Sequence, residues 1–253
     1  MNYFARTLVV CLCQFLPVLM AQAGEFHDDF AAPTLDLERW QVDAKGDCTI
    51  DITAAPDGNP AARFQADNGA RCEIVPRVFS GFLGDLKREP FGTDRWYSFR
   101  VFLGEPWKRS EGNEVLAQWH STRDKFVGDT RGRGPPLALR VIDGYFRISF
   151  GWDKNFRSTK KSLARYTLWY GPVITGRWVE WTVRARWSYE DDGIMQIWRD
   201  GELIVDRDGP NTYNDLRGVY LKIGSYHPRE PRSILFDDVR IGSEDPRAAG
   251  GTP

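Results

Sequence analysis

The sequence predicts an all-β fold, a sandwich or a barrel of antiparallel strands. Apolar and polar residues alternate in many short segments, with the period of two residues that a half-buried strand requires. Asp-Gly pairs at 143–144, 192–193 and 200–201 separate several of these segments, and such pairs are typical of β-hairpins. Helical periodicity is scarce, so the strand–helix–strand units of a parallel sheet are not expected.

The alternating segments give the expected strands, and no internal repeat or linker interrupts them. Residues 24–243 are therefore expected to form one domain. In chain order the strands are RCEI (71–74), RWYSFRVFL (95–103), EVLAQWH (114–120), LALRVI (137–142), YFRISFGW (145–152), WVEWTVRARW (178–187), MQIWRD (195–200), ELIVD (202–206), VYLKIGSY (219–226) and SILFDDVRIG (233–242).

Three stretches lack the strand pattern and are expected to be loops, at 84–95, 121–136 and 153–172. Long loops in compact domains often bind ligands, and solvated loops without a function are the alternative. The stretch 153–172 holds five basic residues against one acid. We expect it to contact a polyanion, with Lys160 and Lys161 as binding residues.

The two ends of the chain are expected to lie outside this domain. Residues 1–23 combine an early arginine, an apolar run and a closing Ala-Gln-Ala, which is typical of a secretory signal peptide cleaved after Ala23. The apolar run is too short to span a membrane, and an uncleaved anchor is the alternative. We therefore expect a secreted or periplasmic protein without a membrane partner, and a disordered tail at 244–253.

The composition gives no support to nucleic acid as a partner, and the cysteines indicate an oxidising compartment. Lys and Arg number 34 and Asp and Glu 35, so the charge balance gives no argument for binding nucleic acid. A monomer is expected. After cleavage two cysteines remain, Cys48 and Cys72, and we expect a disulfide between them, with two buried free thiols as the alternative. Closing this loop would stabilise the fold by about 3 kcal/mol.

Three of the expected strands place polar side chains on one face and apolar side chains on the other. If these strands share a sheet, the polar faces together form one surface with several groups capable of proton transfer or anion binding. The polar faces consist of Arg71 and Glu73 in RCEI, Gln118 and His120 in EVLAQWH, and Tyr220, Lys222 and Tyr226 in YLKIGSY.

Such a set matches the requirements of β-elimination on a uronic acid. The proton on C5 is weakly acidic while the neighbouring carboxylate is charged, so Arg71 or Gln118 near that carboxylate would stabilise the enolate-like transition state. A base must remove the C5 proton and an acid must protonate the departing O4. His120 and Tyr226 can serve these roles in either order. Lys222 or Arg71 beside the tyrosine would favour its phenolate form.

The motifs RCE (71–73), QWH (118–120) and YLKIGSY (220–226), in this order on strands, resemble those of the jelly-roll polysaccharide lyases. The Trp of QWH and the terminal FDDVRIG (236–242) are more similar to the glucuronan lyase and heparin lyase I branch than to the alginate lyases. The resemblance implies a concanavalin-like β-jelly-roll sandwich with a concave groove for an acidic polysaccharide, and no required cofactor. It implies His120 and Tyr226 as the base and acid pair, Gln118 and Arg71 at the carboxylate, and Lys222 beside Tyr226.

Each candidate residue also has a structural interpretation. A histidine in a strand is often structural, Arg71 and Glu73 could pair with charges on neighbouring strands, and Lys222 could be solvated. Tyr220 would line the substrate site or serve the fold alone. Arg140 is a candidate substrate-binding residue, with the outer surface as its alternative location.

Two other functions and a metal site are alternatives for this sequence. A lectin-like module would bind sugar without a base and an acid on one face. A sandwich glycosidase needs two carboxylates at a fixed separation, and the sequence has no E-x-D-x-x-E strand pattern to supply them. Asp28 and Asp237 are candidate ligands of a structural Ca²⁺, with salt bridges and turn caps as the alternative.

Overall fold

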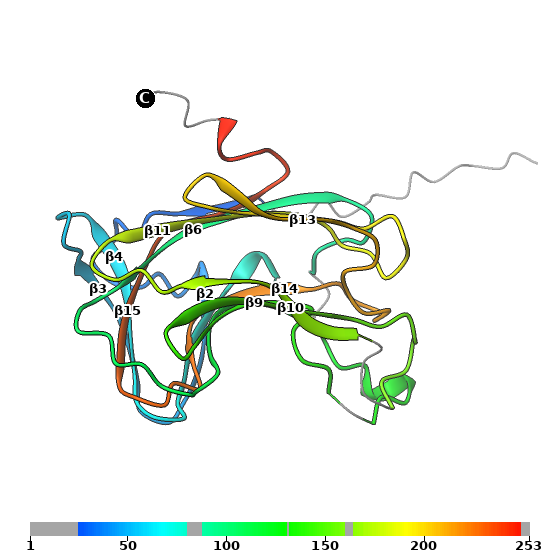
Figure 1. Cartoon of the computed structure of the whole chain (residues 1–253), viewed down its shortest axis with the longest axis horizontal. Coiled ribbons are helices and arrows are strands. Elements are labelled where there is room, and N and C mark those ends of the chain that lie inside the picture. Colours follow the sequence, from blue (N-terminus) through cyan, green and yellow to red (C-terminus); the bar gives the residue numbers. More distant parts are fainter. Residues whose placement is uncertain (1–24, 80–87, 131, 160–163, 249–253) are drawn as a thin grey trace, which may run out of the picture.

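The computed structural model describes residues 25–79, 88–130, 132–159 and 164–248, and it confirms the all-β sandwich. Two antiparallel sheets form the layers, one of eight strands and one of seven (Figure 1). Figure 1 also shows that the seven-stranded sheet is curved, with loops beside the face that points away from the other sheet. In the described residues, the elements outside the sheets are two short 3₁₀ turns, η1 (Arg77–Phe79) and η2 (Lys125–Val127).

The sheets join strands that lie far apart in the chain, as the spatial order shows. The eight-stranded sheet runs β13 (Glu202–Asp208), β12 (Ile194–Arg199), β11 (Trp178–Arg186), β6 (Asp94–Leu103), β15 (Arg232–Gly242), β4 (Pro60–Ala66) and β3 (Cys48–Ala54), with β1 (Phe26–Asp28) also paired to β15. The seven-stranded sheet runs β10 (Ala164–Pro172), β9 (Tyr145–Trp152), β8 (Leu137–Ile142), β7 (Glu114–His120), β14 (Tyr220–Tyr226), β5 (Arg71–Pro76) and β2 (Trp40–Lys45).

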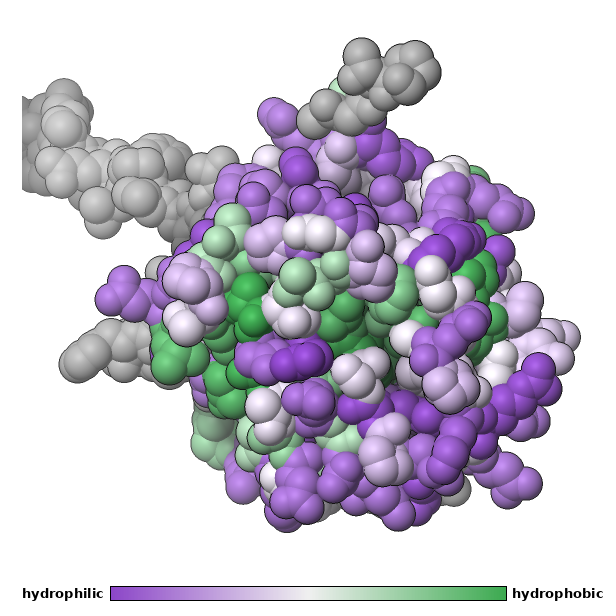
Figure 2. All heavy atoms as spheres, turned by 90° about the vertical axis from the view of Figure 1, so that its left-hand side faces the viewer, coloured by the Kyte–Doolittle hydropathy of each residue, from purple (hydrophilic) through white to green (hydrophobic). Residues whose placement is uncertain are grey.

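Aromatic side chains fill the space between the sheets. Trp119 of β7 packs edge-on against Tyr97 of β6, with 5.3 Å between ring centroids, and Trp181 and Trp187 are also fully buried. Large aromatic rings supply much of the apolar area that stabilises such a core. Seen from the side, hydrophobic residues form a band between two hydrophilic regions, as expected where a core lies between two layers (Figure 2).

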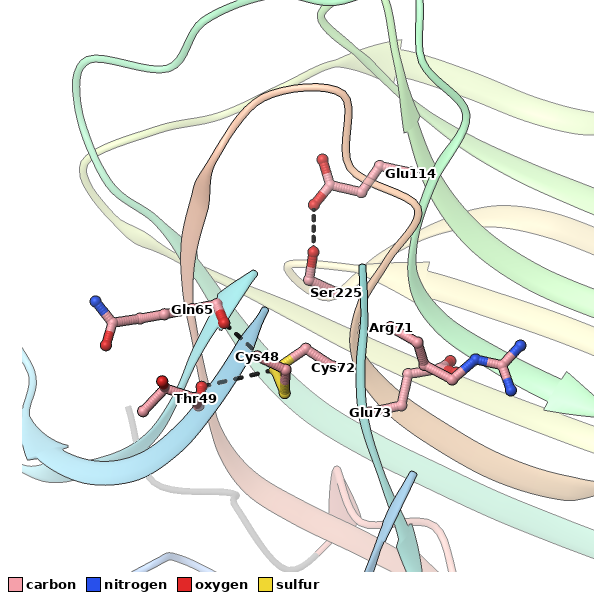
Figure 3. The surroundings of a disulfide bond; sticks show 8 residues. All are labelled: Cys48, Thr49, Gln65, Arg71, Cys72, Glu73, Glu114 and Ser225. Atoms are coloured by element: carbon pink, nitrogen blue, oxygen red, sulfur yellow. Dashed lines mark hydrogen bonds and ion pairs between the residues drawn. A yellow bond between two sulfur atoms is a disulfide. The ribbon is translucent and has the colours of Figure 1, made fainter. Parts of the chain in front are cut away.

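The predicted disulfide between Cys48 and Cys72 is confirmed, and it joins the two sheets. Cys48 lies on β3 of the eight-stranded sheet and Cys72 on β5 of the seven-stranded sheet. Figure 3 shows Cys72 on one side of β5 and Arg71 and Glu73 on the other. The bridge therefore holds the strand that carries Arg71 against the opposite layer.

Two of the Asp-Gly predictions are confirmed in detail, and one turn differs. Asp143 and Gly144 have φ of 49° and 77°, and the pair at 200–201 has 50° and 77°, which are the left-handed values of a tight hairpin turn. The connection at 187–193 also links paired strands, but neither residue of its Asp-Gly pair has a positive φ. This longer loop reverses the direction of the chain without a two-residue turn.

The expectation of a loop throughout 153–172 is wrong for its second half. Residues 164–172 form β10, the edge strand of the seven-stranded sheet. An edge strand has one neighbour and one open side, so it tolerates a polar, basic sequence that a central strand would not. A register shift between Thr167 and Trp169 further breaks its alternation.

The chain ends fall largely outside the described residues, which include neither the expected signal peptide at 1–23 nor residues 249–253. In the expected tail, Arg247 stacks on Trp198 at 3.7 Å from the ring centroid and pairs with Asp245 at 2.6 Å. Within the described part of the chain, no helix has the length and apolar character to cross a membrane.

Candidate active site

The three motif strands are neighbours in the seven-stranded sheet, in the order β7, β14, β5. In the register, Tyr226 pairs with Arg71, Lys222 with Gln118, and Tyr220 with His120. Their chain neighbours Cys72, Trp119 and Leu221 are buried in the core. Because side chains alternate across a strand, the polar set occupies the opposite, free face of the sheet. The prediction that one sheet carries all three motifs is confirmed.

Gly224 in the middle of YLKIGSY allows β14 to lie close against β5. Its φ is 141°, and a Cβ at this position would lie 2.1 Å from the carbonyl oxygen of Cys72. A side chain would push the two strands apart, so this position requires glycine. The pairing of β14 with β7 also shifts register here, between Ile223 and Tyr226. This shift determines which residue of β7 lies opposite Tyr226.

Asp43 of β2 joins the two cations of the site, and no motif in the sequence indicates this role. Its Oδ2 lies 2.5 Å from Nζ of Lys222 and 3.2 Å from Nη1 of Arg71. Burial opposes ionisation of Asp43, but hydrogen bonds and charges from Lys222 and Arg71 keep its pKa below the usual value. Lys222 is itself only 5% exposed, so it is a buried, paired cation, and the solvated alternative is wrong.

Glu73 and Gln118 form a second buried pair beside these charges. Nε2 of Gln118 donates to Oε1 of Glu73, and Glu73 Oε2 lies 3.5 Å from Arg71 Nε and 3.9 Å from Lys222 Nζ. Burial raises the pKa of Glu73 despite these cations. The prediction that Glu73 pairs with neighbouring charges is confirmed. The bond also fixes the amide of Gln118, which keeps a second N–H for another acceptor.

Tyr226 lies beside the guanidinium of Arg71, whose Cζ is 4.4 Å from the ring centroid. Burial works to lower the pKa of Arg71, but its hydrogen bond to Tyr226 and the charges of Asp43 and Glu73 raise it. A fixed positive charge next to a phenol stabilises negative charge on its oxygen.

His120 is neutral at neutral pH and has a defined tautomer. Its Nδ1 lies 2.6 Å from the carbonyl oxygen of Ser121, which can only accept, so Nδ1 carries the proton and Nε2 a lone pair. Burial lowers the pKa of His120 to about 4, and the charges of Lys222 and Arg71 add to this effect. The imidazole can therefore accept a proton through Nε2.

His120 and Tyr226 occupy opposite ends of the cluster. Tyr226 pairs with Val115, which is five residues from His120 on β7. That is about 16 Å of extended strand. Gln118 and Lys222 lie between the two ends, so a bound sugar would rest on these residues with a proton-transfer group on each side.

The other predicted binding residues fall in different places. Tyr220 packs against His120, with 5.7 Å between ring centroids, and against Arg88, whose Cζ is 4.0 Å from the tyrosine ring centroid. Arg140 of β8 donates to Ser149 and Asn113 at 2.7 and 3.2 Å. Lys160 and Lys161 lie outside the described residues.

The candidate calcium ligands are engaged by donors from the chain. Asp28 accepts bonds from the backbone of Phe30 and the indole of Trp40, and Asp237 accepts from Arg100 and from the backbone of Asp238. No cluster of three or more metal-ligating side chains occurs among the described residues. Such bonds are expected if the two aspartates form turn caps and salt bridges, which is the alternative to calcium binding. Calcium binding stays a prediction.

Comparison with known proteins agrees with this fold and these motifs. The model of the polysaccharide lyase family matches residues 32–240. An endo-β-1,4-glucuronan lyase from the fungus Trichoderma reesei is 17% identical with a TM-score of 0.70, and the alignment covers 87% of this chain and 95% of that one. Alginate lyase vAL-1 from Chlorella virus is 10% identical with a TM-score of 0.55, over 83% of this chain and 98% of that one.

Likeness at these identities shows the jelly-roll fold alone, and the search of curated proteins found no match. The family model carries the assignment, because it spans most of the chain and all three motifs. The protein therefore belongs to the polysaccharide lyase family and is a polysaccharide lyase.

Proposed function

We propose that the protein cleaves a uronate polysaccharide by β-elimination on the free face of the seven-stranded sheet. The observation that carries this proposal is the adjacency of β7, β14 and β5, which gathers an imidazole, an amide, a phenol and two cations on one surface. In the reaction a base removes the C5 proton, the electron pair forms a C4–C5 double bond, and the C4–O4 bond breaks as O4 is protonated.

The substrate carboxylate would lie above Gln118 and Arg71. Gln118 has one N–H bound to Glu73 and one left for the carboxylate, and Arg71 contributes positive charge to the same place. Hydrogen bonds and charge at the carboxylate stabilise the enolate-like transition state, in which negative charge moves onto its oxygens. Lys222, held by Asp43, adds to this field.

We assign the base to His120 and the acid to Tyr226. The Nε2 lone pair of the neutral His120 is free to accept the C5 proton. A pKa of about 4 makes it a weak base in the free protein, and the nearby charge of a bound uronate would raise that value. Tyr226 carries a hydroxyl proton to give to O4, and Arg71 beside it stabilises the phenolate that results.

The substrate class follows from the acidic sugar that this chemistry needs. We propose a glucuronan-like polymer first and a heparin-like polymer second. The structural similarity to a glucuronan lyase supports this order. The cross-sheet disulfide supports an exported protein, because such bonds persist in oxidising compartments.

A panel of uronate polymers tests the proposal directly. Glucuronan, alginate and heparin-like chains are incubated with the protein, and the unsaturated product is followed by its ultraviolet absorbance. A carboxyl-reduced version of each polymer is the control. Absorbance should rise with at least one uronate polymer and with no reduced polymer. If every polymer stays intact, or if bonds break without an absorbing product, β-elimination is the wrong reaction.

A further inference from the structure

The free face of the seven-stranded sheet continues beyond the motif strands onto β8, β9 and β10, where three arginines surround a pocket. Arg140, Arg147 and Arg165 line this pocket of about 250 Å³, one from each strand. Leu139 beside Arg140 and Ile148 beside Arg147 are buried in the core. Arg165 pairs with Gly151, whose chain neighbour Phe150 is also in the core. The arginines therefore point to the same free face as Tyr226.

The pocket is in register with the proposed acid. Tyr226 and Arg140 both pair with Val115, from opposite sides, and Arg147 pairs with Arg140. Since neighbouring strands are spaced by about 4.8 Å, the backbones of Arg140 and Arg147 lie about 10 and 14 Å from that of Tyr226. A polymer that crosses the strands at this level would pass from Tyr226 over both arginines.

These arginines have no acidic partner in the described part of the chain, unlike Arg71. Arg140 donates to the neutral side chains of Ser149 and Asn113, and no ion pair joins Arg140, Arg147 or Arg165 to a carboxylate among the described residues. Burial and the positive charges of Arg165 and Arg147 lower the pKa of Arg140 to about 10. A partly buried cation among other cations is unfavourable until an anion joins it.

We propose that Arg140, Arg147 and Arg165 form a second carboxylate subsite, which binds an acidic sugar of the substrate chain away from the bond that is cleaved. Guanidinium groups match carboxylates with paired hydrogen bonds, and a group of three suits an anion better than a neutral sugar. Tyr170, which pairs with Arg147 and is 69% exposed, offers an aromatic surface beyond the pocket. The identity of the polymer rests on the proposed function, whereas the carboxylate preference rests on the arginines alone.

Binding is measured calorimetrically in a Tyr226→Phe background, so that the ligand is not consumed. Glucuronate oligomers of increasing length are compared with their carboxyl-reduced forms and with sulfated oligomers. The double variant Arg147→Gln/Arg165→Gln removes the two exposed arginines. Arg177→Gln/Arg186→Gln, one residue before β11 and at its last residue on the other sheet, is the control with the same charge change.

The subsite predicts about a tenfold or larger loss of affinity for long oligomers in the first double variant, because charge-assisted bonds are lost. Short oligomers that cannot reach the pocket, and the control variant, should show unchanged affinity. Equal losses in both double variants, unchanged binding of long oligomers, or equally tight binding of reduced or sulfated chains would overturn the carboxylate subsite.

The two proposals fail in different ways. If the unmutated protein yields the unsaturated product and the arginine variant keeps its affinity for long chains, the subsite is wrong and the proposed reaction stands. If no polymer yields that product but uronate oligomers bind through the arginines, the subsite stands without the reaction.

Discussion

The two halves of the sheet's free face use positive charge differently. On β5 and β14, Arg71 and Lys222 lie 3.2 and 2.5 Å from Asp43. On β8, Arg140 lies beside two further arginines and bonds to neutral groups. The motif half is therefore a charge-balanced cluster, and the arginine half is a cationic surface without local balance in the described residues.

The difference separates two tasks. Cations paired with Asp43 and Glu73 are fixed in position and can orient a phenol and an amide, but they attract a distant anion weakly because their charge is compensated. Cations without partners attract a polyanion and gain most when it binds. We infer that the motif half performs proton transfer and that the arginine half holds the chain.

The largest effect is expected from removing one hydroxyl in the motif half. Tyr226→Phe keeps the ring against Arg71 and removes the proposed acid, so kcat should fall by about 10²- to 10⁴-fold. Tyr189→Phe, in the loop between β11 and β12 of the other sheet, is the matched control and should leave kcat unchanged. Steady-state kinetics on the best polymer, with folding checked by circular dichroism, compares them. Near-full activity of folded Tyr226→Phe would refute the assignment.

The next largest loss of kcat is expected when the amide of Gln118 is removed, and the amide of Asn113 serves as the comparison. Gln118→Ala removes the donor proposed for the carboxylate and leaves Glu73 without that bond, so kcat should fall by about 10²-fold. Asn113→Ala removes a hydrogen-bond partner that positions Arg140. This variant should raise KM while kcat stays the same. If both variants affect kcat equally, the division of tasks between the halves is wrong.

The disulfide should stabilise the motif half specifically. Cys48→Ser/Cys72→Ser frees β5 from the opposite sheet and should lower the free energy of unfolding by about 3 kcal/mol. Denaturant titration followed by tryptophan fluorescence measures this loss. Under conditions where the variant stays folded, oligomer affinity at the arginine pocket should match that of the parent. An unchanged unfolding midpoint would contradict the structural role of the bridge.

The last expected change concerns the titration of one imidazole. The pKa of His120 is lowered from 6.5 to about 4, so the imidazole stays neutral down to that pH. Between pH 6.5 and 4 the unfolded chain binds a proton that the folded chain does not, so the free energy of unfolding decreases as pH falls through this range. An NMR titration should show one imidazole that protonates near pH 4 and is missing in His120→Gln. An assigned His120 that titrates near 6.5 would contradict the buried, neutral form.

Much of the fold could be predicted because central strands carry a clear alternation. The strands at 114–120, 137–142 and 145–152 were predicted with their observed bounds, since both neighbours and the core impose the pattern. The strand β10 was missed, because its open side permits basic and polar residues. The strand β4 is rich in alanine and begins at Pro60, so its sequence gives little indication of a strand.

The sequence was sufficient to predict which residues form the site, but not most of the contacts between them. Alternation alone places Gln118 with His120 and Lys222 with Tyr226 on common faces. It does not reveal Asp43, whose contact with Lys222 depends on the pairing of β2 with β5 over a long separation in the chain. Burial of Lys222 and Glu73 likewise results from long-range packing. The arginine pocket combines strands that no single motif connects.

A kinetic comparison on one polymer shows whether one half of the face transfers protons while the other holds the chain. Tyr226→Phe and Arg147→Gln/Arg165→Gln are assayed on the same long uronate chain by the absorbance of the unsaturated product. We expect a lowered kcat with little change in KM for Tyr226→Phe, and a raised KM with little change in kcat for the double arginine variant. A loss of kcat in the arginine variant as large as that in Tyr226→Phe would show that the two halves of the face do not divide these tasks.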